Sequence, residues 1–124
     1  MKNTFGSYIR ACRIKAGFGQ REFARKVGVS PSYLNDIEHS KRPSPSANFL
    51  NKMQYYLPID VEKLNDLAGK TKDGLPPDVE HYLLSNTESI SLIRILQNLK
   101  FTDEKILELK NMVASQNYKA IIIA

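Results

Sequence analysis

Residues 19–44 read GQREFARKVGVSPSYLNDIEHSKRPS, and this stretch decides the fold. It contains two short apolar-periodic segments separated by Gly28, a residue that can adopt the left-handed conformation of a tight turn. The small residue Ala24 in the first segment permits a close helix-to-helix contact. Ser30 is a good N-cap and Pro31 suits the first position of the second helix, which we expect to run to about His39. The stretch therefore predicts a helix-turn-helix.

The two faces of the second helix have different chemistry. The apolar residues Val29, Leu34 and Ile37 are expected to anchor it from beneath. Its opposite face is polar and can enter a DNA major groove, which is about 12 Å wide. The residues predicted on that face are Ser30, Pro31, Ser32, Tyr33, Asn35 and Asp36. Such a surface favours hydrogen bonding to base edges over burial.

Further helices are predicted on both sides of this stretch, because apolar residues recur there every three or four positions. An earlier helix uses the stripe Phe5, Ile9, Cys12 and Ala16. Later, Ser44 is expected to cap a fourth helix and Asp60 a fifth, which carries Val61 inward and closes at Gly69. We therefore expect an all-α fold with a five-helix domain over residues 1–69.

The C-terminal half is predicted to be a separate helical element. Residues 70–77 are polar and rich in Gly, Pro and Lys, which predicts a linker. Residues 78–124 predict about three helices, the first opening at Pro77 and the others capped by Thr87 and Thr102. Their apolar stripes are too large to remain in water, so they must pack on each other, on the first domain or on a second copy. We favour a homodimer, with a protein partner as the alternative. For the apolar tail at 120–124, the sequence leaves three states open: an edge strand, a packed tail or a disordered segment.

Charge is distributed unevenly along the 124 residues. Residues 1–58 hold ten Lys and Arg against three Asp and Glu, a balance of +7, whereas residues 59–124 hold eight against ten, a balance of −2. A local basic excess attracts a polyanion and supplies phosphate contacts. The N-terminal half is therefore the part expected to bind nucleic acid.

Several function classes are not expected. The single Cys12 cannot form an intramolecular disulfide, and with His39 and His81 it makes no zinc ligand set, so we expect no metal and no cofactor. Cys12 fits the role of a small buried hydrophobe. No glycine-rich phosphate loop or Ser, His and Asp arrangement predicts an enzyme. No apolar run is long enough to span a membrane and no secretory signal is found, so a cytoplasmic location is expected.

The stretch resembles the phage repressor and Cro family of helix-turn-helix regulators, also called the XRE family. The resemblance covers about Phe5 to Gly69, and its most specific residues are Gln20, Ala24, Gly28, Val29, Ser30, Tyr33, Leu34, Ile37, Glu38, Arg42 and Pro43. It implies phosphate contacts from Gln20 and Ser30, with Gln20 also bracing the recognition helix. It further implies a structural ion pair between Arg13 and Glu38.

The same resemblance assigns the remaining DNA contacts. Ser32, Tyr33 and Asp36 fall where family members read bases, with Asn35 beside them. Lys41 and Arg42 lie in a loop that usually holds the DNA backbone. Apart from the resemblance, Arg21 is one of several basic surface residues and is a further candidate phosphate contact. Tyr33 is either a contact to DNA or a partly buried aromatic residue.

Four positions depart from the family pattern. Ser40 stands where glycine is common, and a positive φ there would cost about 1 kcal/mol. Gly19 replaces a usual Ser or Thr, and Pro31 removes one donor from the reading face. Asp36 is negative where glutamine is frequent, so it either accepts a hydrogen bond from a cytosine amino group or repels phosphates.

Two functions remain open from the sequence. In the first, the protein is a dimeric repressor that reads a palindromic operator in double-stranded DNA through the helix starting at Ser30. In the second, it chiefly binds another protein, as an antitoxin or as the target of an antirepressor, and binds DNA for autoregulation. Both functions require DNA binding.

Overall fold

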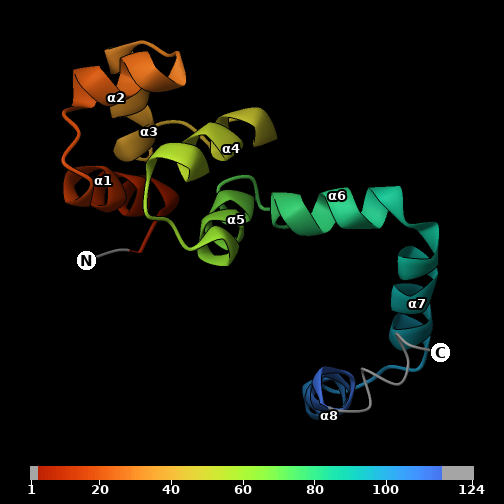
Figure 1. The fold of residues 1–124 in the computed structure, drawn as a ribbon. Helices are drawn as coiled ribbons and strands as arrows, with labels where there is room; N and C mark the ends of the chain where they lie inside the picture. The colour runs from red at the N-terminus through yellow and green to blue at the C-terminus, as the bar shows by residue number, and fades with distance from the viewer. Residues whose placement is uncertain (1–2, 116–124) are drawn as a thin grey trace. The chain divides into compact units, whose positions relative to one another are not determined.

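The computed structural model describes residues 3–115, and every regular element in that range is an α-helix (Figure 1). The helices are α1 (Phe5–Lys15), α2 (Gln20–Val27), α3 (Pro31–Glu38), α4 (Ala47–Tyr56), α5 (Val61–Lys70), α6 (Pro77–Ser85), α7 (Thr87–Asn98) and α8 (Asp103–Ala114). The all-α prediction is confirmed. The apolar tail at 120–124 lies outside the described residues.

The chain divides into two compact units between Tyr82 and Leu83. This division follows shortly after residues 70–77, and the linker predicted there stays a prediction. The first unit holds the helix-turn-helix and the hydrophobic core, and the second holds α7 and α8.

Side-chain caps start several of the helices where the sequence predicts them. The hydroxyl of Ser30 accepts the Tyr33 N–H at the start of α3, and the carboxylate of Asp60 accepts the Lys63 N–H at the start of α5. At the start of α8, the Thr102 hydroxyl accepts the Lys105 N–H. These bonds satisfy backbone donors that have no partner within a helix. The start of α3 is therefore set by local sequence.

The predicted cap of α4 is wrong. The N-cap is Ser46 rather than Ser44. Ser44 is 3% exposed, its hydroxyl donates to the Ala68 carbonyl at 3.3 Å, and its N–H donates to the Thr71 hydroxyl at 2.9 Å. A buried hydroxyl needs a partner, and α5 supplies one that the local sequence does not reveal.

Smaller corrections concern α5 and α7. Gly69 does not close α5, which continues to Lys70, and Val61 at its first position is 47% exposed instead of inward. A Cβ at Gly69 would lie 2.7 Å from the Leu75 backbone, so glycine allows the chain to return over the helix. Asn86 rather than Thr87 is the N-cap of α7.

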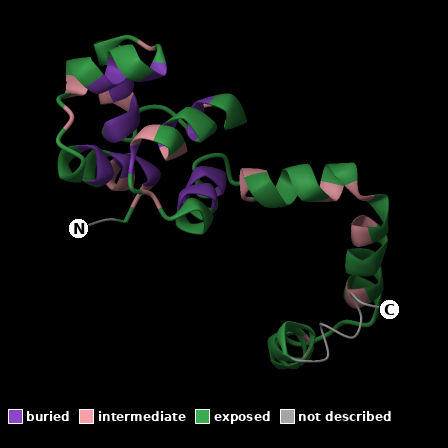
Figure 2. Ribbon diagram, in the orientation of Figure 1, coloured by how far each residue is buried: buried purple, intermediate pink, exposed green. Residues whose placement is uncertain are grey.

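The hydrophobic core lies within the first unit, as the purple segments of Figure 2 show. Its fully covered large side chains include Ile9, Phe23, Leu34, Ile37, Leu50, Met53 and Leu64. Cys12 is 7% exposed and belongs to this core, in agreement with its predicted role as a buried hydrophobe. Because α1 to α5 all contribute to one core, the position of α3 depends on all of these helices.

Two contacts hold α1 against the rest of the unit. Gly6 brings α1 against the end of α3, where its missing side chain leaves room for the backbone carbonyls of Ile37 and Glu38. From the same first turn of α1, the Tyr8 hydroxyl accepts the Asp60 N–H at 2.9 Å. Burial raises the pKa of Tyr8 above its ordinary value.

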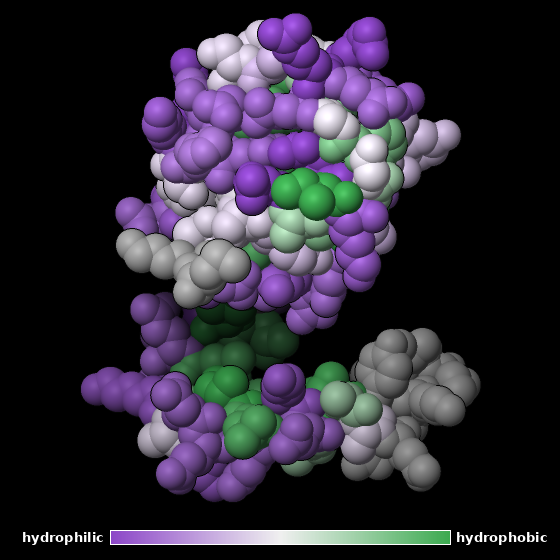
Figure 3. Space-filling model, turned by 90° about the vertical axis from the view of Figure 1, so that its left-hand side faces the viewer, coloured by the Kyte–Doolittle hydropathy of each residue, from purple (hydrophilic) through white to green (hydrophobic). Residues whose placement is uncertain are grey.

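The second unit has a different surface. None of the described residues of α7 and α8 is buried, and large apolar side chains such as Leu92, Ile95, Leu99, Leu107 and Met112 are about half exposed or more. Figure 3 shows hydrophobic side chains, in green, on the surface of this unit. Over the described range, no helix has the length and apolar content to cross a bilayer.

Gly6→Ala is expected to destabilise the first unit by about 1–3 kcal/mol, because the new methyl group would overlap the α3 backbone. Gly74→Ala is the control, since a Cβ there has only the Lys72 carbonyl, at 3.8 Å, within contact distance. Urea unfolding followed by circular dichroism measures both. Equal midpoints for the two variants would contradict the close approach of α1 and α3.

Candidate nucleic-acid interface

The turn between α2 and α3 has the geometry of a tight helix-turn-helix. Gly28 adopts φ 80° at the C-cap of α2, where an L side chain would be strained. Its N–H donates to the Arg25 carbonyl at 3.3 Å, and the Val29 N–H donates to the Ala24 carbonyl at 2.9 Å. These bonds and the left-handed Gly28 end α2 and lead the chain directly into α3.

The underside of α3 is buried as expected, with Leu34 and Ile37 no more than 1% exposed and Val29 packed against the core. On the opposite face, Ser30, Pro31 and Ser32 are exposed, and Tyr33, Asn35 and Asp36 are half-buried. The structure thus brings the predicted reading residues together on one accessible surface.

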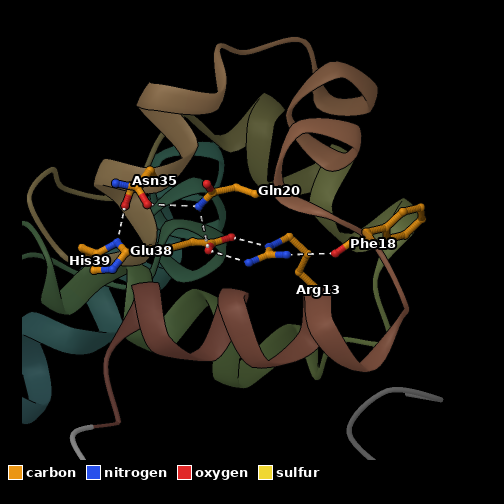
Figure 4. A network of polar contacts seen from close by, with 6 residues as sticks. All are labelled: Arg13, Phe18, Gln20, Asn35, Glu38 and His39. Atoms are coloured by element: carbon orange, nitrogen blue, oxygen red, sulfur yellow. Dashed lines mark hydrogen bonds and ion pairs between the residues drawn. The ribbon is translucent and has the colours of Figure 1, made fainter.

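A buried ion pair connects α1 to the end of α3 (Figure 4). Arg13 Nε donates to Glu38 Oε2 at 2.7 Å and Arg13 Nη2 donates to Glu38 Oε1 at 2.9 Å. Nη1 donates to the Phe18 carbonyl at 2.9 Å. The two side chains are 9% and 0% exposed, so this pair is enclosed within the fold.

Gln20 extends this network toward the surface (Figure 4). Its amide Nε2 donates to Glu38 Oε1 at 3.3 Å and to Asn35 Oδ1 at 3.2 Å. The side chain therefore bridges the start of α2 and the middle of α3. The same bond fixes the orientation of the Asn35 amide, whose oxygen faces Gln20.

A second cluster lies where α3 passes into the next loop. Arg42 Nε donates to Asp36 Oδ2 at 3.3 Å, and the Arg42 guanidinium carbon lies 5.3 Å from the centre of the Tyr33 ring. That ring in turn meets Phe49 at 6.4 Å, close to edge-on. Lys41 is exposed, and Ser40 has φ 59°, the left-handed conformation in which glycine is common.

Two basic residues of α2, Arg21 and Lys26, are also accessible. Arg21 is exposed on the first turn of α2. Lys26 is also exposed, and its Nζ lies 5.7–5.8 Å from the rings of Phe18 and Tyr56. Arg21 therefore adds positive charge at the start of α2, whereas Lys26 is engaged with aromatic rings.

Sequence reasoning missed three contacts at this site: the Phe18 carbonyl as an acceptor for Arg13, the pairing of Asp36 with Arg42, and the contact of His39. His39 Nδ1 lies 2.9 Å from the Asn35 carbonyl. The spacing of Asn35 and His39 along one helix is a signal that was available for the last contact. The other two join residues whose distance depends on the loops.

Comparisons with known proteins place this geometry in context. The helix-turn-helix family model matches residues 9–64. Among curated relatives, the regulator SinR of Bacillus subtilis is 36% identical over 67 residues, which cover 54% of this chain and 60% of SinR. SlrR of the same organism is 36% identical over 61 residues, covering 49% and 40%. RamB of Mycobacterium tuberculosis is 48% identical over 42 residues, covering 34% and 9%.

All three relatives are named as HTH-type transcriptional regulators. The match spans less than two thirds of each relative, 60% in the case of SinR. No solved structure matches the chain significantly.

Glu38→Gln is expected to lower the free energy of unfolding by about 3 kcal/mol or more, because Arg13 would keep its charge in a buried site without its counterion. Thermal and urea unfolding measure this loss. The control is Glu108→Gln, which breaks the exposed Lys105–Glu108 pair and should change stability by less than about 0.5 kcal/mol. Similar losses in both variants would argue against a structural role for the buried pair.

Proposed function

We propose that this protein is a sequence-specific regulator of transcription that binds double-stranded DNA through a helix-turn-helix domain of the XRE type, because the helix-turn-helix family model matches residues 9–64. The observation that carries the proposal is the α3 helix, which is fixed by a buried underside and presents a polar face. The relatives, as HTH-type transcriptional regulators, support the same function.

Binding begins with electrostatic docking of the basic N-terminal unit on the phosphate backbone. In the proposed complex, Arg21, Ser30 and Lys41 contact phosphates through their side chains. Gln20 contacts one through its backbone N–H at the start of α2, because both hydrogens of its side-chain amide are donated to Asn35 and Glu38. These contacts set the register of α3 in the major groove. Ser32, Tyr33 and Asn35 then meet base edges. Arg42 and Asp36 stand at the end of this surface.

Base reading by Ser32 and Asn35 requires that they donate or accept in a defined direction. For Asn35, the network from Arg13 through Glu38 and Gln20 supplies that direction, because each of its members is held by at least one hydrogen bond. A pre-oriented amide loses less conformational entropy on binding than a free one. The buried pair therefore supports recognition without touching DNA.

The apolar surface of the second unit supports a homodimer. Leu92, Ile95, Leu96 and Leu99 follow one stripe of α7, and a groove lined by Leu96, Ile106, Leu109 and Val113 runs between α7 and α8. Such a surface is unfavourable in water and favours association. A dimer would place two recognition helices about 34 Å apart on a palindromic repressor site.

The alternative is that this surface binds a different protein, as in an antitoxin or a regulator controlled by an antirepressor. The same exposed apolar side chains favour that function. The two are separated by the behaviour of the purified chain, since a homodimer needs no second component.

Lys41→Ala and Ser32→Ala are expected to affect binding differently. Removal of the Lys41 charge should weaken binding to a selected operator and to mixed-sequence duplex alike and reduce the salt dependence by about one phosphate contact. Ser32→Ala should change the preferred sequence and leave mixed-sequence affinity nearly unchanged. Selection from a random DNA library, followed by salt titrations with both duplexes, measures these effects. Equal losses on both duplexes for both variants would contradict base reading by α3.

The double variant Leu92→Gln and Leu99→Gln should shift the full chain from dimer to monomer, because it makes the apolar stripe of α7 polar. Sedimentation equilibrium measures the change, with Arg94→Gln as the control on the opposite side of the same helix. A wild-type chain that is monomeric at every concentration would reject the homodimer and favour the partner-binding alternative.

A further inference from the structure

We propose that Asp36 is a positioning residue that acts on DNA through Arg42. The pair lowers the affinity for DNA of any sequence and raises the ratio of operator to mixed-sequence affinity. This inference rests on the proposed function. It assigns a role to Asp36, for which the sequence leaves two different roles open. Those two roles are direct contact with a cytosine amino group and simple repulsion of phosphates.

The first observation is the direction of the contact. Asp36 accepts from Nε of Arg42, the nitrogen nearest the aliphatic stem. Among the described residues, the structure shows no acceptor for the terminal nitrogens Nη1 and Nη2. These remain as a fork of donors that matches paired acceptors, such as the N7 and O6 of guanine or two phosphate oxygens.

The second observation is that Arg42 is held from two sides. The carboxylate of Asp36 meets one edge of the guanidinium, and the Tyr33 ring lies 5.3 Å from its central carbon. Tyr33 and Asp36 are three positions apart on α3 and so share a face. The ring is itself supported by the buried Phe49, so the base of the cluster belongs to the core.

The third observation is that stability does not account for the pair. The side chains of Arg42 and Asp36 are 55% and 29% exposed, and exposed ion pairs of this kind contribute at most about 1 kcal/mol. What the pair changes is the direction of the guanidinium and the local net charge. A carboxylate beside Arg42 reduces its attraction for any phosphate while leaving its terminal donors available for a correctly placed acceptor.

The consequence has a definite sign. Without the carboxylate, Arg42 would be more mobile and more strongly attracted to phosphates. Asp36→Asn should therefore bind mixed-sequence duplex more tightly, by about fivefold, and steepen the salt dependence by about one phosphate contact. The ratio of operator to mixed-sequence affinity should fall, because more of the binding would be independent of sequence.

The test is a double-mutant cycle in the full chain with Asp36→Asn, Arg42→Ala and the double variant. The probes are the duplex enriched from a random library by the wild-type protein and a mixed-sequence duplex of equal length, each titrated over a range of salt concentrations. Positioning through Arg42 predicts that Asp36→Asn has no effect in the Arg42→Ala background. Asp36→Glu, which keeps a carboxylate, should retain most of the wild-type ratio of operator to mixed-sequence affinity.

The control is Glu62→Gln, which removes one negative charge from an exposed residue of α5. It should change neither the discrimination ratio nor the coupling with Arg42. Unfolding midpoints close to that of the wild-type protein are expected for the variants at Asp36, Arg42 and Glu62. A signal from the Arg42 Nε–H in nitrogen-15 NMR spectra of the free protein, slowed in exchange and lost in Asp36→Asn, gives a readout that is independent of DNA.

Two results would overturn the inference and leave the proposed function standing. An equal gain in mixed-sequence affinity with and without Arg42 would show simple repulsion by Asp36. If Asp36→Asn removed the preference for one base equally in the wild-type and Arg42→Ala backgrounds, Asp36 would read that base directly. A wild-type chain that binds neither duplex would reject the proposed function itself, and the inference with it.

Discussion

The buried ion pair between Arg13 and Glu38 is the interaction on which the candidate interface depends. It joins α1 to the last turn of α3 by two hydrogen bonds, at 2.7 and 2.9 Å, and its third bond fixes the chain at Phe18 just before α2. One guanidinium therefore links α1 to α3 and to the loop that leads into α2. A buried charge pair is costly to desolvate, and it persists where its geometry and additional hydrogen bonds compensate that cost.

From this pair the order extends outward in two steps. The Gln20 side chain is held in one orientation, because its amide donates to both Glu38 and Asn35. Asn35 lies at the edge of the accessible face. At the far end of α3, a separate cluster of Asp36, Arg42 and Tyr33 rests on Phe49. The recognition surface thus combines an end that is held from within the core with an end that is held by an exposed ion pair and an aromatic ring.

The two units of the chain solve the burial of apolar residues differently. In the first, five helices enclose a common core, and the polar face of α3 is what remains outside. In the second, the described residues of α7 and α8 leave their apolar stripes accessible. The same hydrophobic effect that closes the first unit is therefore the driving force that we assign to association of the second.

The sequence by itself determined the elements that depend on neighbours along the chain. The caps at Ser30 and Asp60, the turn at Gly28 and the buried underside of α3 follow from local hydrogen bonding, backbone conformation and helical periodicity. The pairing of Arg13 with Glu38 was available only through the resemblance to a family. Tertiary structure alone decided that Ser44 is buried against α5 instead of capping α4, and that Arg42 returns to Asp36. The physical reason is that such contacts depend on where loops place distant residues, and periodicity carries no information about that distance.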